Sequence, residues 1–325
     1  MSILVYIENV EGKFKKSAFE VLSFGSAIAT HLKLPLVALS IGDVSDDELA
    51  KAGKYGATKV LKSTGDNLKA MNAQPYSSVV AQAATAEGSK VVVMSASFAG
   101  KAIAPRVAIK LNAGLGENII DLPEMSSGFV VKKGAYSGKA FAFVEILSDV
   151  KVISMMPNSY KVVENATETS IVPFAATIDV NDTKMLVKET IRSTDKVSLP
   201  DAELVVSAGR GMKGPENWGM IEELAQILGA ATACSKPVSD SGWRPHSEHV
   251  GQTGIAISPN LYLAVGISGA IQHLAGVSSS KVIVVVNKDP EAPFFKAADY
   301  GIVGDAFEVL PKLIEAAKAF KASQN

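Results

Sequence analysis

Short apolar runs alternate with helical patterns along the first 111 residues of this chain. The apolar runs predict strands at residues 3–7, 36–41, 58–61 and 90–94. The periodic segments predict a helix with Val21, Phe24, Ile28 and Leu32 on one face, and further helices at 46–55 (capped by Ser45 or Asp46), 76–87 and 101–111. Because neighbouring parallel strands need a long crossover, usually a helix, this alternation predicts a mainly parallel sheet with helices on both faces.

The pattern changes between residues 129 and 155. The segments FVVKK, AFAFVEIL and KVISMM all have strand character, and no helical pattern separates them. We expect them to be antiparallel or edge strands that close the first domain. Residues 164–200 are rich in Thr, Asp, Glu and Ser and hold only scattered apolar side chains. We therefore expect an extended connector that adds a strand to a partner or to the first domain.

A second series of strands and helices begins near residue 204. Strands are predicted at 204–207, 230–234, 261–265, 282–286 and 301–303, and helices at 218–228 and 307–320. The chain is therefore expected to be an α/β protein with two domains, each a mainly parallel sheet flanked by helices. The expected divisions are residues 1–163 for the first domain, 164–200 for the connector and 201–325 for the second domain.

Charge and cysteine content exclude several classes of function. The formal net charge is -1, from 32 Lys and Arg against 33 Asp and Glu, so nothing points to nucleic acid or an acidic membrane surface. Cys234 is the only cysteine, which excludes an internal disulfide and a thiolate metal cluster. His246 and His249 lack the further ligands of a metal set, so no metal is expected. Since the sequence shows neither a targeting signal nor a long apolar run, we expect a cytoplasmic protein without membrane insertion.

The stretch from residue 250 to residue 305 concentrates the candidate binding residues. It contains VGQTG, SGAIQHLAG, KVIVVVNKDPEAPFF and ADYGIVGD in close succession. Gly269 precedes an apolar helix, where a phosphate could approach backbone N–H groups. Asn287 and Asp305 each follow an apolar strand, and the carboxyl ends of parallel strands gather at one edge of a sheet. The stretch therefore predicts a site for a nucleotide cofactor.

Three further segments carry side chains suited to such a site, although each also has a structural explanation. Arg210 lies between two glycines after a strand, where it aims a fork of N–H donors at a ligand or is a surface arginine in a tight turn. Ser235 and Lys236 follow a strand, where they face an electron-rich ring or are simply solvated. Gln252 and Thr253 occupy a glycine-flanked loop, as ligand contacts or as an ordinary polar turn.

Other polar residues are weaker candidates for ligand contacts. Ser268 is predicted to cap a helix in which His273 lies one turn from the start, and an ordinary capped helix with a structural histidine would explain both. Asp289 and Glu291 belong to a proline-bounded loop that needs no further explanation. The loop SASFAGK at 95–101 follows a strand of the first domain; it either binds a nucleotide weakly or belongs to a nucleotide fold that has lost its ligand.

Six motifs carry a resemblance to a known family. GRG at 209–211, ENW at 216–218, VGQTG, SGAIQHLAG, NKDPEAP and ADYGIVGD, in this order and spacing, resemble the alpha subunit of electron transfer flavoproteins, a family that includes FixB. The resemblance implies an N-terminal domain similar to adenine nucleotide hydrolases, placed at the subunit interface without a catalytic site. It also implies a C-terminal FAD-binding domain of the DHS-like NAD/FAD-binding type, with one FAD in each alpha subunit.

The resemblance also assigns the cofactor contacts. They are Arg210, Ser235, Lys236, Val250, Gly251, Gln252, Thr253, Ser268, Gly269, Ala270, Ile271, Gln272, His273, Asn287, Asp305 and Ala306. Thr253 is expected near flavin N5, and His273 at the O2 carbonyl, where a donor stabilises negative charge on the reduced ring. Asn287 and Asp305 are expected at the adenosine half. Lys236 stands where the family usually has arginine, so the charge is kept but the stacking plane is lost.

The sequence contains no evident nucleophile–base pair, paired carboxylates or metal set, so the chemistry is expected to be the cofactor's. The resemblance implies an electron carrier rather than an enzyme. The resemblance implies a heterodimer with an electron transfer flavoprotein (ETF) beta subunit, which would hold AMP or a second FAD. Electrons would come from acyl-CoA-type dehydrogenases of fatty acid beta-oxidation and pass to ETF-quinone oxidoreductase or a similar acceptor. A bifurcating or FixAB-type complex stays open, as do, more distantly, a non-redox scaffold subunit and an NAD- or thiamin-type enzyme subunit.

Overall fold

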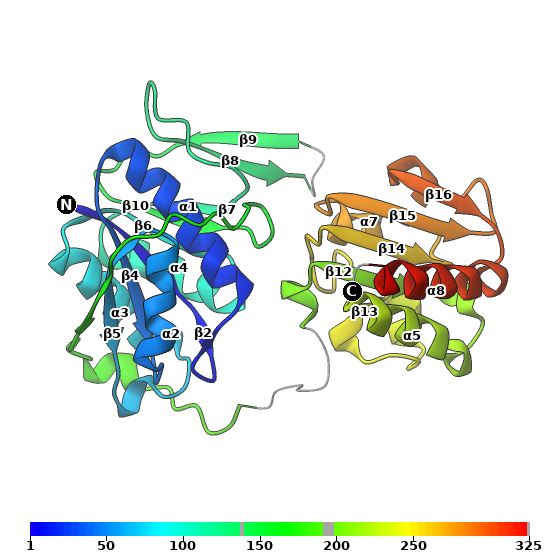
Figure 1. Cartoon of the computed structure of the whole chain (residues 1–325), viewed down its shortest axis with the longest axis horizontal. Helices are drawn as coiled ribbons and strands as arrows, with labels where there is room; N and C mark the ends of the chain where they lie inside the picture. The colour runs from blue at the N-terminus through cyan, green and yellow to red at the C-terminus, as the bar shows by residue number, and fades with distance from the viewer. Residues whose placement is uncertain (137–139, 191–197, 324–325) are drawn as a thin grey trace. The chain divides into compact units, whose positions relative to one another are not determined.

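The computed structural model describes residues 1–136, 140–190 and 198–323, which form two compact units (Figure 1). The first unit comprises Met1–Ala135 and Phe141–Arg192, and the second comprises Ser193–Asn325 with Tyr136–Ala140. Each unit has its own hydrophobic cores on the two faces of its own sheet. The predicted α/β class with two mainly parallel sheets is confirmed, while the narrower fold names given above remain predictions.

Within the described residues, the main sheet of the first unit has nine strands. They are β1 (Ser2–Ile7), β4 (Leu36–Ile41), β5 (Ala57–Ser63), β6 (Ser89–Ser95), β7 (Gly114–Ile119), β8 (Val130–Ala135), β9 (Ala140–Glu145), β10 (Lys151–Met155) and β11 (Ser170–Pro173). Their order across the sheet is β11-β5-β4-β1-β6-β10-β7-β8-β9. The pairs from β11 to β7 are parallel, and β7 and β8 are antiparallel. The short strands β2 (Asn9–Val10) and β3 (Lys13–Phe14) form a separate ribbon.

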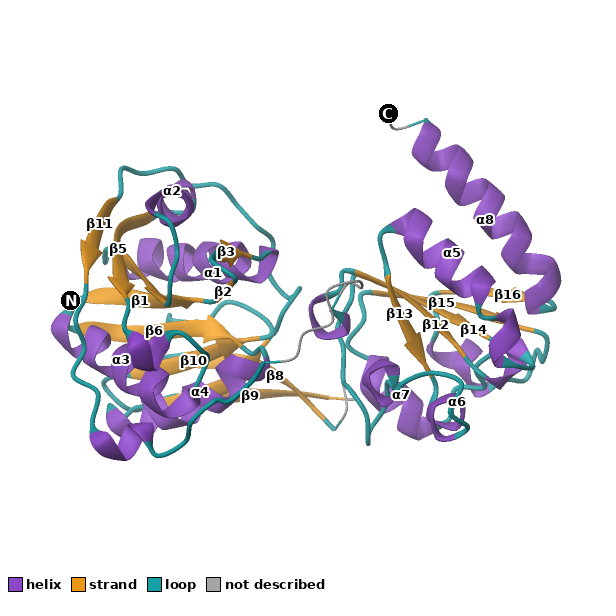
Figure 2. Cartoon of the chain, turned by 90° about the horizontal axis from the view of Figure 1, so that it is seen from below, coloured by secondary structure: helices purple, strands orange, loops and turns teal. Residues whose placement is uncertain are grey.

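Helices cover both faces of this sheet (Figure 2). α1 (Lys16–Leu32) and the short α2 (Asp46–Ala50) lie on one face, and α3 (Ala73–Ala86) and α4 (Phe98–Lys110) on the other. The predicted cap of α2 is confirmed, since Ser45 Oγ accepts a hydrogen bond from Glu48 N. β1 is buried on both faces because alternate residues point into different cores, Ile3 towards α1 and Leu4 towards α3 and α4.

The prediction for residues 129–155 is wrong in one part. β10 is neither antiparallel nor at an edge: it lies between β6 and β7, parallel to both, with Val152 and Ile153 fully buried. A short, nearly continuous apolar run is typical of a strand buried on both faces. β7 is absent from the predicted strands because its sequence, GLGENI, has two glycines and little apolar character. β8 and β9 do close the sheet at one edge, as predicted.

The connector contributes a strand to the first unit, which is one of the two outcomes expected for it. β11 pairs in parallel with β5 at the edge of the sheet. The chain then passes over α3, where Gln82 exchanges two hydrogen bonds with the backbone of Thr177 (2.7 and 2.9 Å) and Asn72 donates to the carbonyl of Met185 (2.9 Å). These bonds hold the polar segment on the first unit as far as residue 185.

The described part of the second unit contains a parallel sheet of five strands. They are β12 (Leu204–Ala208), β13 (Ala231–Cys234), β14 (Leu261–Val265), β15 (Val282–Asn287) and β16 (Tyr300–Val303), in the order β13-β12-β14-β15-β16. Helices α5 (Gly219–Leu228) and α8 (Ala306–Ala322) cover one face, and α7 (Ile271–Val277) lies on the other (Figure 2). The short α6 (Lys236–Asp240) packs Val238 into the core beneath α5 and α8. The strand order therefore reverses between β12 and β14. Ligands of such sheets bind outside the carboxyl ends of the strands at this switch point.

Candidate nucleotide-cofactor site

Three loops meet at the carboxyl ends of β12, β14 and β15. Their backbones are joined by hydrogen bonds from Gly209 N to Val265 O (2.9 Å), from Gly211 N to Gly266 O (3.1 Å) and from Gly266 N to Val286 O (2.8 Å). A Cβ atom on Gly211 would lie only 2.6 Å from Gly266 Cα, so the loops touch through bare backbone. Gly209, Gly211 and Gly266 thus form a glycine seat at the switch point.

Two predicted cations lie beyond strand ends and are exposed. Arg210 opens a 3-10 turn between two glycines of the seat, and its side chain is solvent-exposed. Lys236 opens α6, where its Nζ lies 2.8 and 2.9 Å from the two carboxylate oxygens of Asp240. The charge of Lys236 is therefore shared with an acidic neighbour, whereas Arg210 has no recorded ion pair with the described residues.

A short loop, residues 249–255, begins beside the end of β13, where Val250 N donates to Cys234 O (3.1 Å), and carries Gln252 and Thr253 exposed at its tip. Ile255 N donates to His249 O (2.9 Å), which closes the base of the loop, and Gly254 N donates to Gly251 O (3.1 Å). Gln252 N donates to Gln272 O (2.7 Å) in the first turn of α7. The 249–255 loop is thus fastened to the segment that follows β14, which brings two of the predicted motifs together.

The segment after β14 differs from the prediction at its start. Ser268 is not the N-cap, because Gly269 takes a left-handed conformation (φ +85°) and α7 begins only at Ile271, after Ala270. A Cβ atom on Gly269 would lie 2.5 Å from Phe294 N, so the turn requires glycine. Phe294 N donates to Ser268 O (3.1 Å), which leaves the side chain of Ser268 exposed at the sheet edge.

His273 is buried beneath this edge. Its Nε2 is hydrogen-bonded to Tyr262 Oη (2.8 Å), and its Nδ1 has no hydrogen-bond partner among the described residues. Burial and the neighbouring His249 lower the pKa of His273 to about 4, against a small opposing effect of the Val250 backbone. His273 is therefore neutral near pH 7, so it can offer a proton on one nitrogen only.

The polar side-chain atoms of Asn287 and Asp305 form hydrogen bonds within the protein. Asn287 donates from Nδ2 to Ile267 O (2.9 Å) and accepts at Oδ1 from Asp289 N (3.1 Å), so it ties the loop after β15 to the loop after β14. Asp305 caps α8 by accepting from Phe307 N (2.9 Å). Its second oxygen lies 3.9 Å from Nζ of Lys213, a residue that sequence reasoning missed.

The structure divides the predicted site residues by exposure. Exposed are Arg210, Lys236, Gln252, Thr253, Ser268, Ala270, Ile271 and Gln272; partly buried are Asn287 and Asp305; buried are Ser235, Val250, Gly251, Gly269, His273 and Ala306. Most of the exposed members are polar and come from loops after three different strands. The buried members shape those loops from below.

Arg244 supports the site from outside the predicted set. Its guanidinium donates twice to the carboxylate of Glu248 (2.7 and 2.8 Å) and once to Glu222 of α5 (2.8 Å), and it lies 5.5 Å from the ring of Trp218. These contacts raise the pKa of Arg244 and fix the segment that leads into the 249–255 loop. The i, i+4 spacing of Arg244 and Glu248, and the ENW motif that contains Trp218, were the available signals.

The first unit offers no comparable site in its described part. In the loop at 95–101, Ser97 caps α4 and donates to Glu8 (2.6 Å), and a Cβ atom on Gly100 would lie 1.8 Å from Ser95 O. A closed loop facing a carboxylate is unsuited to phosphate, which supports the interpretation of a nucleotide fold without its ligand.

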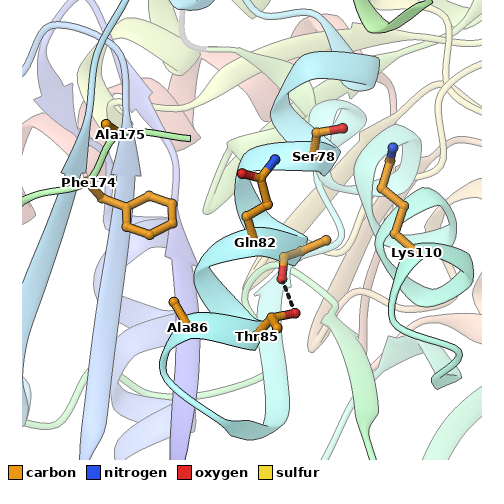
Figure 3. A pocket seen from close by; sticks show the side chains of 8 residues that line it. Ser78, Gln82, Thr85, Ala86, Lys110, Phe174 and Ala175 are labelled. Atoms are coloured by element: carbon orange, nitrogen blue, oxygen red, sulfur yellow. Dashed lines mark hydrogen bonds between the residues drawn. The ribbon is translucent and has the colours of Figure 1, made fainter. Parts of the chain in front are cut away.

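An open groove in the first unit lies where the connector passes α3 and α4 (Figure 3). Ser78, Gln82, Lys110 and Phe174 are among its lining residues. Asp182 accepts a hydrogen bond from Ser78 and lies 3.6 Å from Lys110 Nζ, so the polar groups of the groove serve to hold the connector. Over the described ranges, no group of His, Cys, Asp and Glu could hold a metal, and no helix is long and apolar enough to cross a membrane.

The residues at the switch point fit a nucleotide cofactor. At the glycine seat and at the Gly269 turn, loop backbones pack closely with no room for a Cβ atom between them. Neighbouring loops carry exposed amide, hydroxyl and guanidinium groups, and the buried Nδ1 of His273 has no hydrogen-bond partner in the described part of the chain. Fold and site together define an α/β protein whose second unit is built to hold such a cofactor.

Comparison with known proteins agrees with a cofactor-binding second unit. The electron transfer flavoprotein domain matches residues 3–184, and the electron transfer flavoprotein FAD-binding domain matches residues 198–278. Electron transfer flavoprotein subunit alpha of Bacillus subtilis (strain 168) is 36% identical over 96% of both chains. Protein FixB of Clostridium saccharobutylicum is 33% identical, covering 97% of this chain and 96% of its own, and the mitochondrial subunit alpha of Dictyostelium discoideum is 33% identical, with 98% and 92% covered. The chain belongs to the electron transfer flavoprotein alpha subunit family.

The resemblance drawn from the six motifs is thereby confirmed. Members of this family are electron-transfer proteins that normally pair with a beta subunit and pass electrons to redox partners. The matched FAD-binding domain supports a flavin as the cofactor.

Proposed function

We propose that this chain holds one FAD at the switch point of its second unit and acts as the electron-carrying subunit of a heterodimer, without a substrate of its own. The observation that carries the proposal is the gathering of exposed polar groups at one sheet edge: Arg210 beside the glycine seat, the tip of the 249–255 loop, and Ser268 with Gln272 after β14. The match to the FAD-binding domain supports the choice of cofactor.

In this proposal the exposed side chains bind and orient the flavin. Gln252 and Thr253 offer an amide and a hydroxyl to the ring edge and the ribityl hydroxyls. Arg210 supplies a permanent positive charge, which favours negative charge on the reduced ring. Lys236 contributes less than an unpaired cation would, since Asp240 neutralises it in part. When bound, FAD supplies the reversible redox chemistry, and the chain supplies placement and electrostatics.

The buried residues are proposed to prepare the site rather than to surround it. If Tyr262 donates to Nε2 of His273, the single proton of the neutral ring lies on Nδ1, which can then donate to a ring carbonyl. Asn287 and Asp305 hold the loops that would face the adenosine half. Ser235, Val250, Gly251, Gly269 and Ala306 set the course of the backbone.

We further propose a cytoplasmic carrier that takes electrons from acyl-CoA-type dehydrogenases and delivers them to a quinone-linked oxidoreductase. The beta subunit would hold AMP in that case. A FixAB-type or bifurcating complex is the second candidate, and the similarity to FixB favours keeping it. The flavin content of the purified heterodimer separates the two, because one FAD with one AMP fits the simple carrier and two FAD fit the bifurcating complex.

The test of the cofactor proposal is a visible absorption spectrum of the chain co-purified with its beta subunit. We expect the two visible bands of oxidised flavin, with FAD released on denaturation, and weaker retention in Gln252→Ala and Thr253→Ala. Ser323→Ala, at the end of α8 far from Asp305, is the matched control. A colourless complex that FAD cannot reconstitute would refute the proposal.

A further inference from the structure

The imidazole of His249 fills the interior of the 249–255 loop. His249 is 2% exposed. A Cβ atom on Gly254 would lie 2.8 Å from its Nδ1, and one on Gly251 would lie 3.5 Å from its Nε2. Both glycines therefore pack directly on the ring. The backbone that carries Gln252 and Thr253 folds around this one side chain.

The groups around His249 give its charged form little support. Its Nδ1 has no hydrogen-bond partner among the described residues. The titratable groups that face it are His246, whose ring centroid lies 5.3 Å away, Lys236 and Asp240 of α6, and His273 of α7. His246 and Lys236 disfavour a proton on His249, and Asp240 favours it.

The loop also depends on its contact with α7 on the other side. Gly251 packs against the backbone of Gly276, since a Cβ on Gly276 would lie 2.5 Å from Gly251 N. Gln252 N is bonded to Gln272 O. The loop is thus held between the His249 ring and α7, and moving the ring displaces the backbone that places Gln252 and Thr253.

We propose that His249 is a positioning residue for flavin binding: its neutral ring holds the 249–255 loop in shape, and a proton on that ring loosens the loop and weakens retention of FAD. This inference rests on the proposed function of Gln252 and Thr253. Burial, His246 and Lys236 lower the pKa of His249, with Asp240 opposing, so the ring is neutral above its ordinary pKa of about 6.5 and becomes charged, with loss of binding, as the pH falls through its lowered value.

The first experiment measures the affinity of the flavin-stripped heterodimer for FAD at about pH 8, where histidine is neutral. We expect His249→Ala to weaken binding by about tenfold or more, because the loop loses its filling. His246→Ala, at the exposed neighbour three positions earlier, should stay within about twofold of the parent protein. An unchanged affinity in His249→Ala would overturn the proposal.

The second experiment follows the release of FAD, by its fluorescence, as the pH is lowered towards about 5. His249→Gln keeps a polar side chain of similar length but cannot take up a proton. We expect it to release FAD less steeply than the parent. His246→Gln should keep the steep release but at a slightly higher pH, because it removes a group that disfavours the proton on His249. If His249→Gln kept the parent profile, the proton-dependent part of the proposal would be wrong. This readout separates a positioning role from a merely structural one, and it serves even if His249→Ala folds poorly.

Variants at the loop tip distinguish the inference from the function on which it rests. Should Gln252→Ala and Thr253→Ala both bind FAD as tightly as the parent, the proposed site itself fails. Should they weaken binding while His249→Ala does not, the site stands and only the positioning role is refuted.

Discussion

The hydrogen bond between Tyr262 and His273 is buried at a point where most polar groups of the site are exposed. Tyr262 is fully buried and His273 is 6% exposed, and both rings lie close to Phe294. An apolar environment disfavours the charged form of a histidine. The pair therefore makes the second unit sensitive to acid independently of any cofactor.

This sensitivity can be measured on the flavin-free chain. The pKa of His273 is about 4 in the folded state and about 6.5 in the unfolded state. As the pH falls between these values, the unfolded chain binds a proton that the folded chain does not, so the free energy of unfolding should fall by about 3 kcal/mol. Above about pH 6.5 the effect is absent. Urea denaturation followed by tryptophan fluorescence is suitable, since both tryptophans, Trp218 and Trp243, lie in the second unit.

The matched variant is His273→Gln, which should flatten the decline in stability between those pH values. His31→Gln, at an exposed residue of the first unit, should leave it unchanged. Equal acid slopes in His273→Gln and the parent would contradict the assignment.

Arg244 is the second residue whose contribution can be isolated. Its side chain is 13% exposed and bonds two carboxylates. Lysine cannot reproduce the two-pronged contact with Glu248, so Arg244→Lys should lower the free energy of unfolding by about 2 kcal/mol. Lys318→Ala removes the exposed pair with Glu223 on the same unit and should cost no more than about 0.5 kcal/mol. If urea denaturation gave similar losses in the free energy of unfolding for both variants, the Arg244 network would contribute no more than an exposed ion pair.

At the scale of elements, the site depends on how closely the loops after β12 and β14 approach. The contact between Gly211 and Gly266 is backbone against backbone. Gly211→Ala would force the loops apart, and we expect a loss of about 2 kcal/mol in stability together with weaker FAD retention. Gly219→Ala, at the start of α5, has nothing within 4 Å of the new Cβ, so alanine should be neutral or slightly stabilising there. If both alanine variants behave alike in denaturation and FAD binding, the close approach is not essential.

The elements were largely predictable, because apolar runs and helical periodicity report burial directly. β7 is not predicted from the sequence, because two glycines and a glutamate give it little strand character. The position of β10 in the sheet is predicted wrongly, because the apolar character of a strand does not reveal which strands lie beside it. At the site, glycine spacing indicated the loops correctly. The cap at Ser268 was wrong because Gly269 turns the chain before α7 can start. His249 was missed because its role depends on two glycines folding over its ring, which no local pattern encodes.

At the scale of the whole molecule, the chain consists of two units with separate cores. Phe24 of α1 is fully buried in the first unit, and Phe24→Ala should cost about 4 kcal/mol there. In the isolated chain, far-UV circular dichroism should therefore show an earlier transition, while tryptophan fluorescence from the second unit keeps its parent midpoint. Ile109→Ala, at an exposed site on α4, should change neither signal appreciably. Coincident shifts of both signals in Phe24→Ala would mean that the units unfold as one.

The direct contact of two loop backbones at Gly211 and Gly266 has a consequence for how such a protein can diverge. No amino acid other than glycine fits at these positions without rebuilding both loops at once. A single substitution at either position is therefore expected to be eliminated during evolution. Gln252, Thr253 and Gln272 are exposed, so a substitution at one of them changes the proposed contacts with FAD without forcing the two loops apart. Tuning of the bound cofactor is therefore expected to proceed through the loop tips, with the seat beneath them inherited unchanged.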